Sequence, residues 1–190
     1  MNKPEIAVFG GSFDPPHLGH LLLAHYALAV TNVVEVIVAP TFVHAFGKPL
    51  LDFDHRLAMT KLAFADLGRV SVDPIERQLG GVSRTIRLVE QLALRHPGAR
   101  LRLLIGTDIL TESARWQHFE EVRALAPLII GGRGGFPHPD VDPNAPLLPE
   151  LSSSEVRTAL ARGEDLSTRV PARVRHYIAQ HGLYRSEPRA

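Results

Sequence analysis

Hydrophobic positions fall into two patterns that alternate along the chain. Short runs rich in apolar residues, typical of buried strands, occur at residues 6–9, 34–39, 70–72, 101–105 and 128–130. Apolar residues recur at helical spacing between these runs, at residues 18–30, 53–66, 86–93 and 116–126. The alternation predicts an α/β fold with a Rossmann-like parallel sheet and helices on both faces. Ligands bind such sheets at the carboxyl ends of the strands, where the strand order reverses.

The stretch 131–149 breaks this alternation because it is rich in glycine and proline, which excludes a helix or a central strand. We expect a surface loop there, followed by helices at residues 153–161 and 173–180 within a C-terminal part that spans 151–185. A chain of 190 residues with 45% hydrophobic composition suits one compact core, so we expect residues 1–190 to form a single domain.

Composition excludes several classes of function. The formal net charge is +1 and no basic, aromatic-rich stripe is present, so a nucleic-acid partner is disfavoured. The lack of cysteine excludes disulfides and thiolate-bound zinc and fits a reducing compartment. No segment approaches the roughly 18 apolar residues of a membrane span. We therefore expect a cytoplasmic protein with no membrane contact.

The segment GGSFDPPHLGH at residues 10–20 follows the first predicted strand and leads into a helix. Paired glycines let a backbone turn sharply near a ligand, and Pro15 and Pro16 suit the start of a helix. His17 and His20 then share one face of the first turn, at a helix N-terminus that favours anions. Gly19 costs about 1 kcal/mol inside a helix relative to alanine, so some group must approach it closely. The segment predicts a phosphate site.

Other interpretations of this segment fit less well. A single histidine is usually a satisfied structural residue, and two histidines in a metalloprotease helix stand four apart with a glutamate between them. No Gly-Lys-Ser/Thr follows the glycines, which excludes a P-loop, and the dinucleotide fingerprint is absent.

A second candidate phosphate site is LSSSEVR at residues 151–157. Ser152 and Glu155 fit a capping box, which is a purely structural explanation for both. Arg157 remains unexplained, because the helix dipole disfavours a cation near a helix N-terminus. A bound polyphosphate would account for it, with the serine hydroxyls, backbone N–H groups and arginine as donors.

Three further features bear on a second substrate. The run LIGTD at residues 104–108 ends a predicted strand in Gly-x-Asp, where the carboxylate suits ribose hydroxyls or caps the next helix. Trp116, the only tryptophan, is placed to stack on a heteroaromatic ring or to fill the core. The segment 83–85 opens a helix and offers N–H and hydroxyl donors to a small carboxylate or amide.

Residues 11–20 resemble the first signature of the nucleotidyltransferase superfamily, whose core is His-x-Gly-His, and residues 151–157 resemble its second signature, Ile-Ser-Ser-Thr-x-x-Arg. The acceptor features and residues 170–185 resemble the bacterial nicotinate-mononucleotide adenylyltransferases. The chain departs from that family where Arg84 replaces a tyrosine, and where residues 43–48 replace Pro-Pro-His-Lys. The loop before the second signature is short.

The resemblance implies adenylyl transfer from ATP to nicotinate mononucleotide, in NAD biosynthesis, with Mg²⁺ carried by ATP and no metal ligand from the protein. The implied partners are ATP and a pyridine mononucleotide. It assigns catalysis to His17, His20 and Arg157. It assigns phosphate binding to Gly10, Gly11, Ser12, Phe13, Gly19, Lys48, Ser152, Ser153 and Ser154. It assigns nucleotide or acceptor binding to Thr85, Gly106, Asp108 and Trp116. Nicotinamide mononucleotide as acceptor, a pantetheine-phosphate adenylyltransferase, and a non-catalytic nucleotide-binding module remain alternatives.

Overall fold

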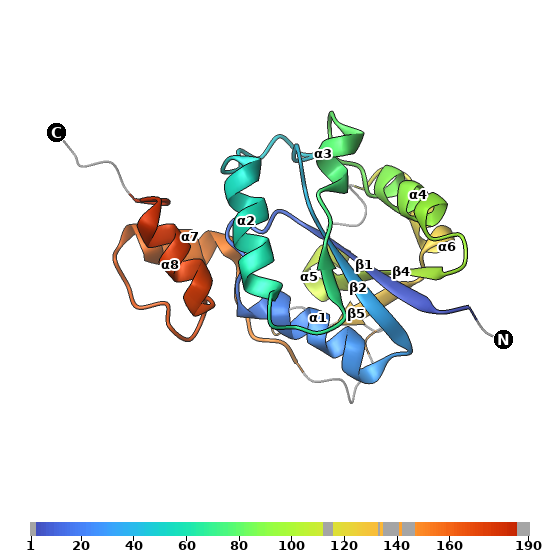
Figure 1. Ribbon diagram of the computed structural model, residues 1–190, viewed down its shortest axis with the longest axis horizontal. Helices are drawn as coiled ribbons and strands as arrows, with labels where there is room; N and C mark the ends of the chain where they lie inside the picture. Colours follow the sequence, from blue (N-terminus) through green and yellow to red (C-terminus); the bar gives the residue numbers. More distant parts are fainter. Residues whose placement is uncertain (1–2, 112–115, 133, 135–140, 142–146, 186–190) are drawn as a thin grey trace.

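The structure is a computed structural model that describes residues 3–111, 116–132, 134, 141 and 147–185. Strands and helices alternate along the chain, as the hydrophobic pattern predicts (Figure 1). The strands are β1 (Glu5–Gly11), β2 (Val33–Pro40), β3 (Val70–Val72), β4 (Arg100–Gly106) and β5 (Leu128–Gly131). The helices are α1 (Leu18–Val30), α2 (Phe53–Phe64), α3 (Ile75–Leu79), α4 (Thr85–Arg95), α5 (Thr107–Thr111), α6 (Phe119–Leu125), α7 (Ser153–Ala161) and α8 (Ala172–Gln180).

Within the described residues these strands form one five-stranded sheet in the order β3-β2-β1-β4-β5, and every pairing in it is parallel. The chain builds outward from β1 to β3, then returns to the other side of β1 and continues through β4 to β5. The order therefore reverses between β1 and β4. Ligands bind at this point in open α/β sheets, so the topology directs attention to the carboxyl ends of these two strands.

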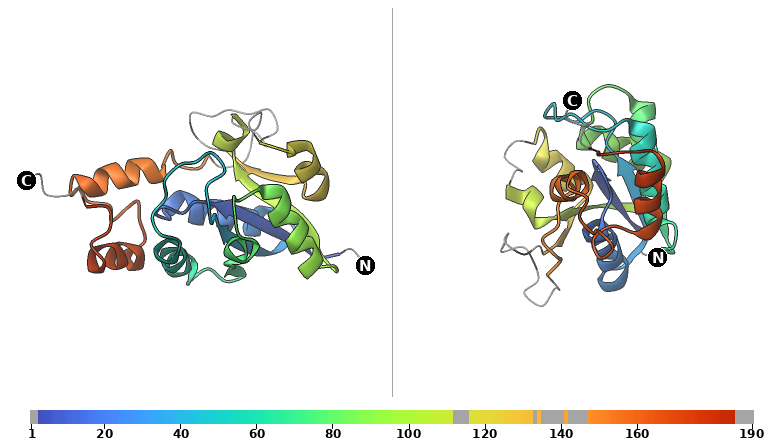
Figure 2. Two further views of the ribbon diagram at one scale, coloured as in Figure 1. Left: turned by 90° about the horizontal axis from the view of Figure 1, so that it is seen from above. Right: turned by 90° about the vertical axis from the view of Figure 1, so that its left-hand side faces the viewer.

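Two hydrophobic clusters cover the two faces of the sheet, because successive side chains of a strand point to opposite sides. From β1, Ala7 and Phe9 join the cluster formed with α1, α2, α7 and α8. Ile6 and Val8 join the opposite cluster, formed with α3, α4 and α6. Figure 2 shows the sheet between these helices. The prediction of a parallel sheet covered on both faces is confirmed.

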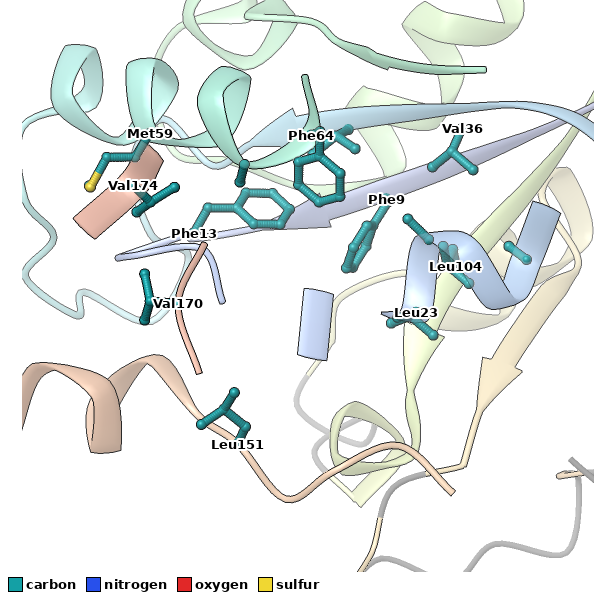
Figure 3. Packing of buried hydrophobic residues seen from close by; sticks show 14 of the residues in the cluster. Phe9, Phe13, Leu23, Val36, Met59, Phe64, Leu104, Leu151, Val170 and Val174 are labelled. Atoms are coloured by element: carbon teal, nitrogen blue, oxygen red, sulfur yellow. The ribbon is translucent and has the colours of Figure 1, made fainter. Parts of the chain in front are cut away.

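Helices α7 and α8 lie beyond the carboxyl ends of the strands, next to α2 (Figure 1, orange and red). Their buried residues include Val156 and Val174, and both belong to the cluster on the α1 and α2 face. Figure 3 shows Val174 near Met59 of α2, with Phe13 pointing into the same cluster. The C-terminal part of the chain therefore packs against the edge of the sheet where a ligand is expected.

Several local predictions differ from the structure. Helices α3 and α5 have five residues each, too few for a helical period to be visible in the sequence. The helix expected over residues 116–126 begins only at Phe119, so Trp116 lies outside it. His17 is the N-cap of α1, so both prolines precede the helix instead of occupying its first position.

The surface loop expected from residue 131 begins one residue later, because Gly131 ends β5 and is buried. The backbone N–H of Leu148 donates to the carbonyl of Gly132 (2.8 Å), which ties the end of this stretch back to its beginning. Residues 133, 135–140 and 142–146 of the expected loop lie outside the described residues. In the part of the chain that is described, no helix has both the length and the apolar character needed to cross a bilayer.

Candidate active site

Two adjoining cavities open at the carboxyl ends of β1 and β4. The first has a volume of about 300 Å³ and the second about 230 Å³. They share part of their walls, formed by Gly10, Gly11, Ser12, Leu104, Ile105, Ile109 and Trp116. Because of this shared wall, two ligands bound in the two cavities would lie next to each other at the β1 turn.

The first cavity collects every residue that the sequence assigns to catalysis or phosphate binding. The residues from the first motif and its surroundings that line it are Gly10, Gly11, Ser12, Phe13, His17, Gly19, His20 and Lys48. Those from the second motif are Ser152, Ser153, Ser154 and Arg157. Two segments from opposite ends of the chain therefore meet in one cavity.

The residues predicted to bind the nucleotide or acceptor divide between the two cavities. Gly106 and Asp108 line the first cavity, beside the phosphate motifs. Thr85 lines the second cavity, and Trp116 lines both. The structure thus brings all four to one region without placing them in a single subsite.

His17 and His20 lie against each other at the start of α1. Their ring centroids are 3.8 Å apart with an interplanar angle of 31°. The backbone N–H of His17 donates to Nδ1 of His20 (3.1 Å). An accepting Nδ1 carries no hydrogen, so the neutral ring of His20 holds its proton on Nε2, as assigned from this hydrogen bond. The capping contact thereby leaves His20 a defined donor.

Gly19 lies close against the His17 ring. A Cβ atom at Gly19 would lie 3.1 Å from both Cε1 and Nδ1 of His17. The sequence predicted that some group must approach this glycine, and the structure identifies the imidazole of His17. Gly19 therefore acts through the position of His17.

Phe13 lines the first cavity but its side chain is fully buried in the core. Its ring packs edge-on against Phe9 and Phe64, with centroids 5.4 and 6.2 Å away, and Figure 3 shows it directed between them. It also lies 4.9 Å from the ring of His20. Its backbone adopts a φ of 48°, unfavourable for a bulky residue. The buried ring of Phe13 thus fixes the position of the turn in the core and packs against the imidazole of His20.

The N-terminus of α7 forms the opposite wall of the first cavity. The predicted capping box is present, since Ser152 Oγ accepts from the N–H of Glu155 (3.2 Å) and the Glu155 carboxylate accepts from the N–H of Ser152 (2.7 Å). Ser152 also donates its hydroxyl hydrogen to Glu155, and Ser153 donates its own to the carbonyl of Pro15 (3.0 Å). Ser154 instead accepts from Arg157, and its hydroxyl makes no further side-chain hydrogen bond within the described residues.

Arg157 bridges the two motifs. Its Nη1 donates to the backbone carbonyl of Asp14 (2.6 Å) and its Nη2 to the hydroxyl of Ser154 (3.0 Å). A guanidinium carries five N–H donors, and within the described residues these two bonds are its only hydrogen bonds. The remaining donors are available to an anion in the cavity.

Two residues that the sequence did not single out organise the site. Arg56 of α2 is 1% exposed, and it donates to the carbonyls of Leu51, Ser12, Thr41 and Phe42. Burial lowers the pKa of Arg56, and the charge of Asp14 opposes this effect. The signal was the position of an arginine three residues after Phe53, on the buried face of the helix.

The second such residue is Asp14, buried inside the first motif. Its carboxylate accepts from the hydroxyl of Tyr184 (2.6 Å) and from the backbone N–H of Leu51 (3.2 Å). Its motif position was visible in the sequence, but its partners come from three distant segments.

The second cavity combines the N-terminus of α4 with a buried carboxyl group. Thr85 opens α4 and Arg84 is its N-cap. Burial raises the pKa of Glu76, while a hydrogen bond from Ser83 and the charge of Arg87 lower it. Ser83 Oγ also accepts from the N–H of Phe42 (3.0 Å). The wall thus offers helix-terminal N–H groups and a cation beside an acidic group.

The end of β4 belongs to the first cavity. A Cβ atom at Gly106 would lie 2.5 Å from Oδ1 of Asp108, so only glycine permits this carboxylate to fold back over the strand end. Trp116 packs edge-on against Phe119, with centroids 5.8 Å apart, which holds the indole at the boundary between the cavities.

Known proteins resemble this chain over most of its length. The family model described as Cytidylyltransferase-like matches residues 8–159. A protein of Anaeromyxobacter dehalogenans (strain 2CP-1) named "Probable nicotinate-nucleotide adenylyltransferase" is 48% identical, over 95% of this chain and 97% of the relative. One of the same name from Myxococcus xanthus is 40% identical, over 95% and 94%.

Among solved structures, a Plasmodium falciparum nicotinic acid mononucleotide adenylyltransferase complexed with NaAD has the same fold, with a TM-score of 0.79. It is 21% identical, and the match covers 95% of this chain and 97% of that one. With the family model covering most of its length and relatives of this identity, the chain belongs to the nicotinate-nucleotide adenylyltransferase family.

Proposed function

We propose that the protein transfers the adenylyl group of ATP to the phosphate of nicotinate mononucleotide, forming the dinucleotide of NAD biosynthesis and pyrophosphate. The observation that carries this proposal is the convergence of both phosphate motifs on the first cavity, which shares a wall with a second cavity. A reaction between a nucleoside triphosphate and a second nucleotide needs two adjoining sites of this kind.

The reaction requires no nucleophile from the protein. An oxygen of the acceptor phosphate attacks the α-phosphorus of ATP, and the bond breaks between that phosphorus and the oxygen that bridges it to the β-phosphorus. That oxygen leaves as a terminal oxygen of pyrophosphate. Catalysis is then positioning plus stabilisation of charge. His20 donates from Nε2 to the transferring phosphate, with His17 beside it, while Ser12 and the backbone of Gly10 and Gly11 approach from β1.

Charge on the polyphosphate is offset from the α7 side. Arg157 keeps N–H donors for it, and the hydroxyl of Ser154 makes no further side-chain hydrogen bond in the described residues. Lys48 lines the same cavity and supplies a second cation. Mg²⁺ carried by ATP would neutralise part of the charge on the leaving pyrophosphate, and we assign it no ligand from the protein.

The acceptor occupies the second cavity, with its pyridine ring against Trp116 and its carboxylate at the N-terminus of α4. Thr85 and the backbone N–H groups there are the donors, and Arg84 adds a positive charge that favours nicotinate over nicotinamide. NaAD in the Plasmodium falciparum relative supports a nicotinate-type product.

The first test measures pyrophosphate release from ATP and Mg²⁺ with nicotinate mononucleotide, nicotinamide mononucleotide or phosphopantetheine as acceptor. We expect the first to react with the highest kcat/KM. Equal rates with both pyridine nucleotides would overturn the proposed selectivity, and turnover only with phosphopantetheine would overturn the proposed acceptor. ATP binding without any turnover would favour a non-catalytic nucleotide-binding module.

The metal proposal is tested in the same assay. Removing divalent ions with a chelator should abolish pyrophosphate release, and excess Mg²⁺ should restore it. Zinc should have no effect on the magnesium-dependent rate. Full activity in the chelator would contradict the assignment.

A further inference from the structure

A chain of contacts links the C-terminal segment to the cation of the first cavity. The Tyr184 hydroxyl donates to Oδ1 of Asp14 (2.6 Å), and the backbone carbonyl of Asp14 accepts from Arg157 (2.6 Å). The other carboxylate oxygen, Oδ2, lies 3.9 Å from Nη1 of Arg157 and accepts from the N–H of Leu51. The carboxylate thus stands at the limit of ion pairing with the arginine without a direct hydrogen bond to it.

The charges around Asp14 explain why this distance matters. Asp14 lines the same cavity as Arg157, and a carboxylate there both repels a polyphosphate and competes for the guanidinium. Two guanidinium groups, those of Arg56 and Arg157, interact with this one carboxylate, so the group carries one net positive charge for a ligand. If the Asp14 carboxylate moved closer to Arg157, it would pair with the guanidinium and occupy the N–H donors that would otherwise bind the ligand.

Tyr184 is held in an unusual backbone conformation. Its φ is 59°, in the left-handed region that a bulky residue rarely adopts, and its side chain is half-buried. Such conformations persist only where surrounding contacts impose them, and they concentrate at functional sites. Burial and the neighbouring Asp14 carboxylate raise the pKa of Tyr184 well above its ordinary range, so its hydroxyl keeps the proton that it donates.

We propose that Tyr184 is a positioning residue that holds the Asp14 carboxylate away from Arg157, which keeps the arginine available to the polyphosphate of ATP. The inference rests on the proposed function only in taking ATP as the ligand. Without the Tyr184 hydroxyl, the Leu51 N–H is the one remaining hydrogen bond to the carboxylate among the described residues. The carboxylate can then turn toward Arg157, and ATP binding weakens.

The test is a double-mutant cycle on ATP affinity, measured by calorimetry with Mg²⁺ and no acceptor. The variants are Tyr184→Phe, Asp14→Asn and the pair together. Tyr177→Phe is the matched control, because the Tyr177 hydroxyl contacts Nδ1 of His55 (3.0 Å), away from the cavities. We expect Tyr184→Phe to raise the Kd for ATP about tenfold, the change typical of one hydrogen bond to a charged group, and the control to leave it unchanged.

The double variant distinguishes this mechanism from a general effect of charge. Asp14→Asn should lower the Kd about tenfold more in the Tyr184→Phe background than in the wild type, because only there does the carboxylate compete for Arg157. An equal effect in both backgrounds would overturn the proposal, as would an unchanged Kd in Tyr184→Phe.

Two readouts separate the proposal from other failures. Irreversibly misfolded protein lowers the number of binding sites per chain but leaves the Kd of the folded fraction unchanged, and a thermal melt shows whether reversible unfolding contributes to the Kd at the assay temperature. If Tyr184→Phe does not fold, Asp14→Asn alone decides, since a tenfold weaker ATP affinity in it would show that the carboxylate supports the site instead of competing in it. Because no acceptor is present, a wrong assignment of the acceptor affects pyrophosphate release and not these affinities.

Discussion

The two cavities at the edge of the sheet are assembled in different ways. The first takes most of its polar groups from two continuous segments, residues 10–20 and 152–157, and these segments hydrogen-bond to each other through Arg157 and Ser153. The second is lined by short pieces of chain that lie far apart in sequence, among them residue 41 and residues 44–46, 83–85 and 116–117. The phosphate chemistry is therefore encoded locally, and the acceptor chemistry depends on how several elements pack.

This difference predicts that substitutions in the first cavity affect the chemical step, whereas those in the second affect the choice and affinity of the acceptor. Arg56 connects the two cavities, because it donates to the carbonyl of Ser12, which lines both, and to the carbonyl of Thr41, which lines the second. Five substitutions test the comparison, from the largest expected effect to the smallest.

His20→Ala should lower kcat for pyrophosphate release by about 10²–10³, the loss typical of removing one donor to a transition-state oxygen. The KM for the acceptor should change little. His25→Ala on the exposed side of the same helix is the control and should retain wild-type kcat. A His20→Ala enzyme within tenfold of wild type would remove this residue from catalysis.

Arg56→Met should disturb both cavities and the fold. The carbonyls that it serves would lose their donor, so we expect about 3 kcal/mol lower free energy of unfolding and a Tm lower by roughly 6–12 °C. At temperatures where the variant is still folded, the KM values of both substrates should rise. Arg102→Met is the control, since Arg102 also donates to two carbonyls but at the other end of β4. Unchanged KM values in Arg56→Met would show that the two cavities are independent.

Trp116→Ala should raise the KM for nicotinate mononucleotide by about 10- to 100-fold, the loss expected for one stacked ring. The KM for ATP should rise much less. Trp116→Phe, which keeps a ring, should recover most of the acceptor affinity. A larger rise in the KM for ATP than for the acceptor would place the indole with the first substrate.

Arg84→Gln removes the cation at the N-cap of α4 without removing the helix N–H groups. The ratio of kcat/KM for nicotinate mononucleotide to that for nicotinamide mononucleotide should fall about tenfold, the effect of one charge-assisted hydrogen bond. Arg87→Gln, on the same helix but bonded to the carbonyls of Leu79 and Gly80, is the control. An unchanged ratio would show that Arg84 does not contribute to the selectivity and that the backbone N–H groups provide it.

Glu76→Gln should give the smallest effect, visible only as a change with pH. Because burial raises the pKa of Glu76, the native state binds this proton more tightly than the unfolded chain. The wild type therefore loses stability as pH rises from the ordinary pKa of 4.5 toward the raised one. The Tm of Glu76→Gln relative to wild type should increase over that window and then level off. A difference that is constant from pH 4 to pH 9 would contradict the burial effect.

Much of the fold was predictable because each strand and long helix carries its own periodicity. The five apolar runs become β1 to β5, and the helix at residues 153–161 has the predicted bounds. Prediction was weaker where an element has five residues, as in α3 and α5, or where the pattern spans a bend, as at Trp116. Such segments are defined by what they pack against.

The sequence by itself determined the succession of strands and helices along the chain and the two phosphate motifs that line the first cavity. A phosphate site needs glycines, donors and a helix start within a few residues, so such a motif is visible in the sequence. Only the tertiary structure decided the placement of Arg56 under both cavities, the contact of Tyr184 with Asp14, and the division of Gly106, Asp108 and Thr85 between the two walls. The physical reason is the separation in sequence between the interacting residues. Hydrogen bonds within one turn join residues a few positions apart, so they follow from local spacing. A buried charge finds its partners only when distant segments exclude water together.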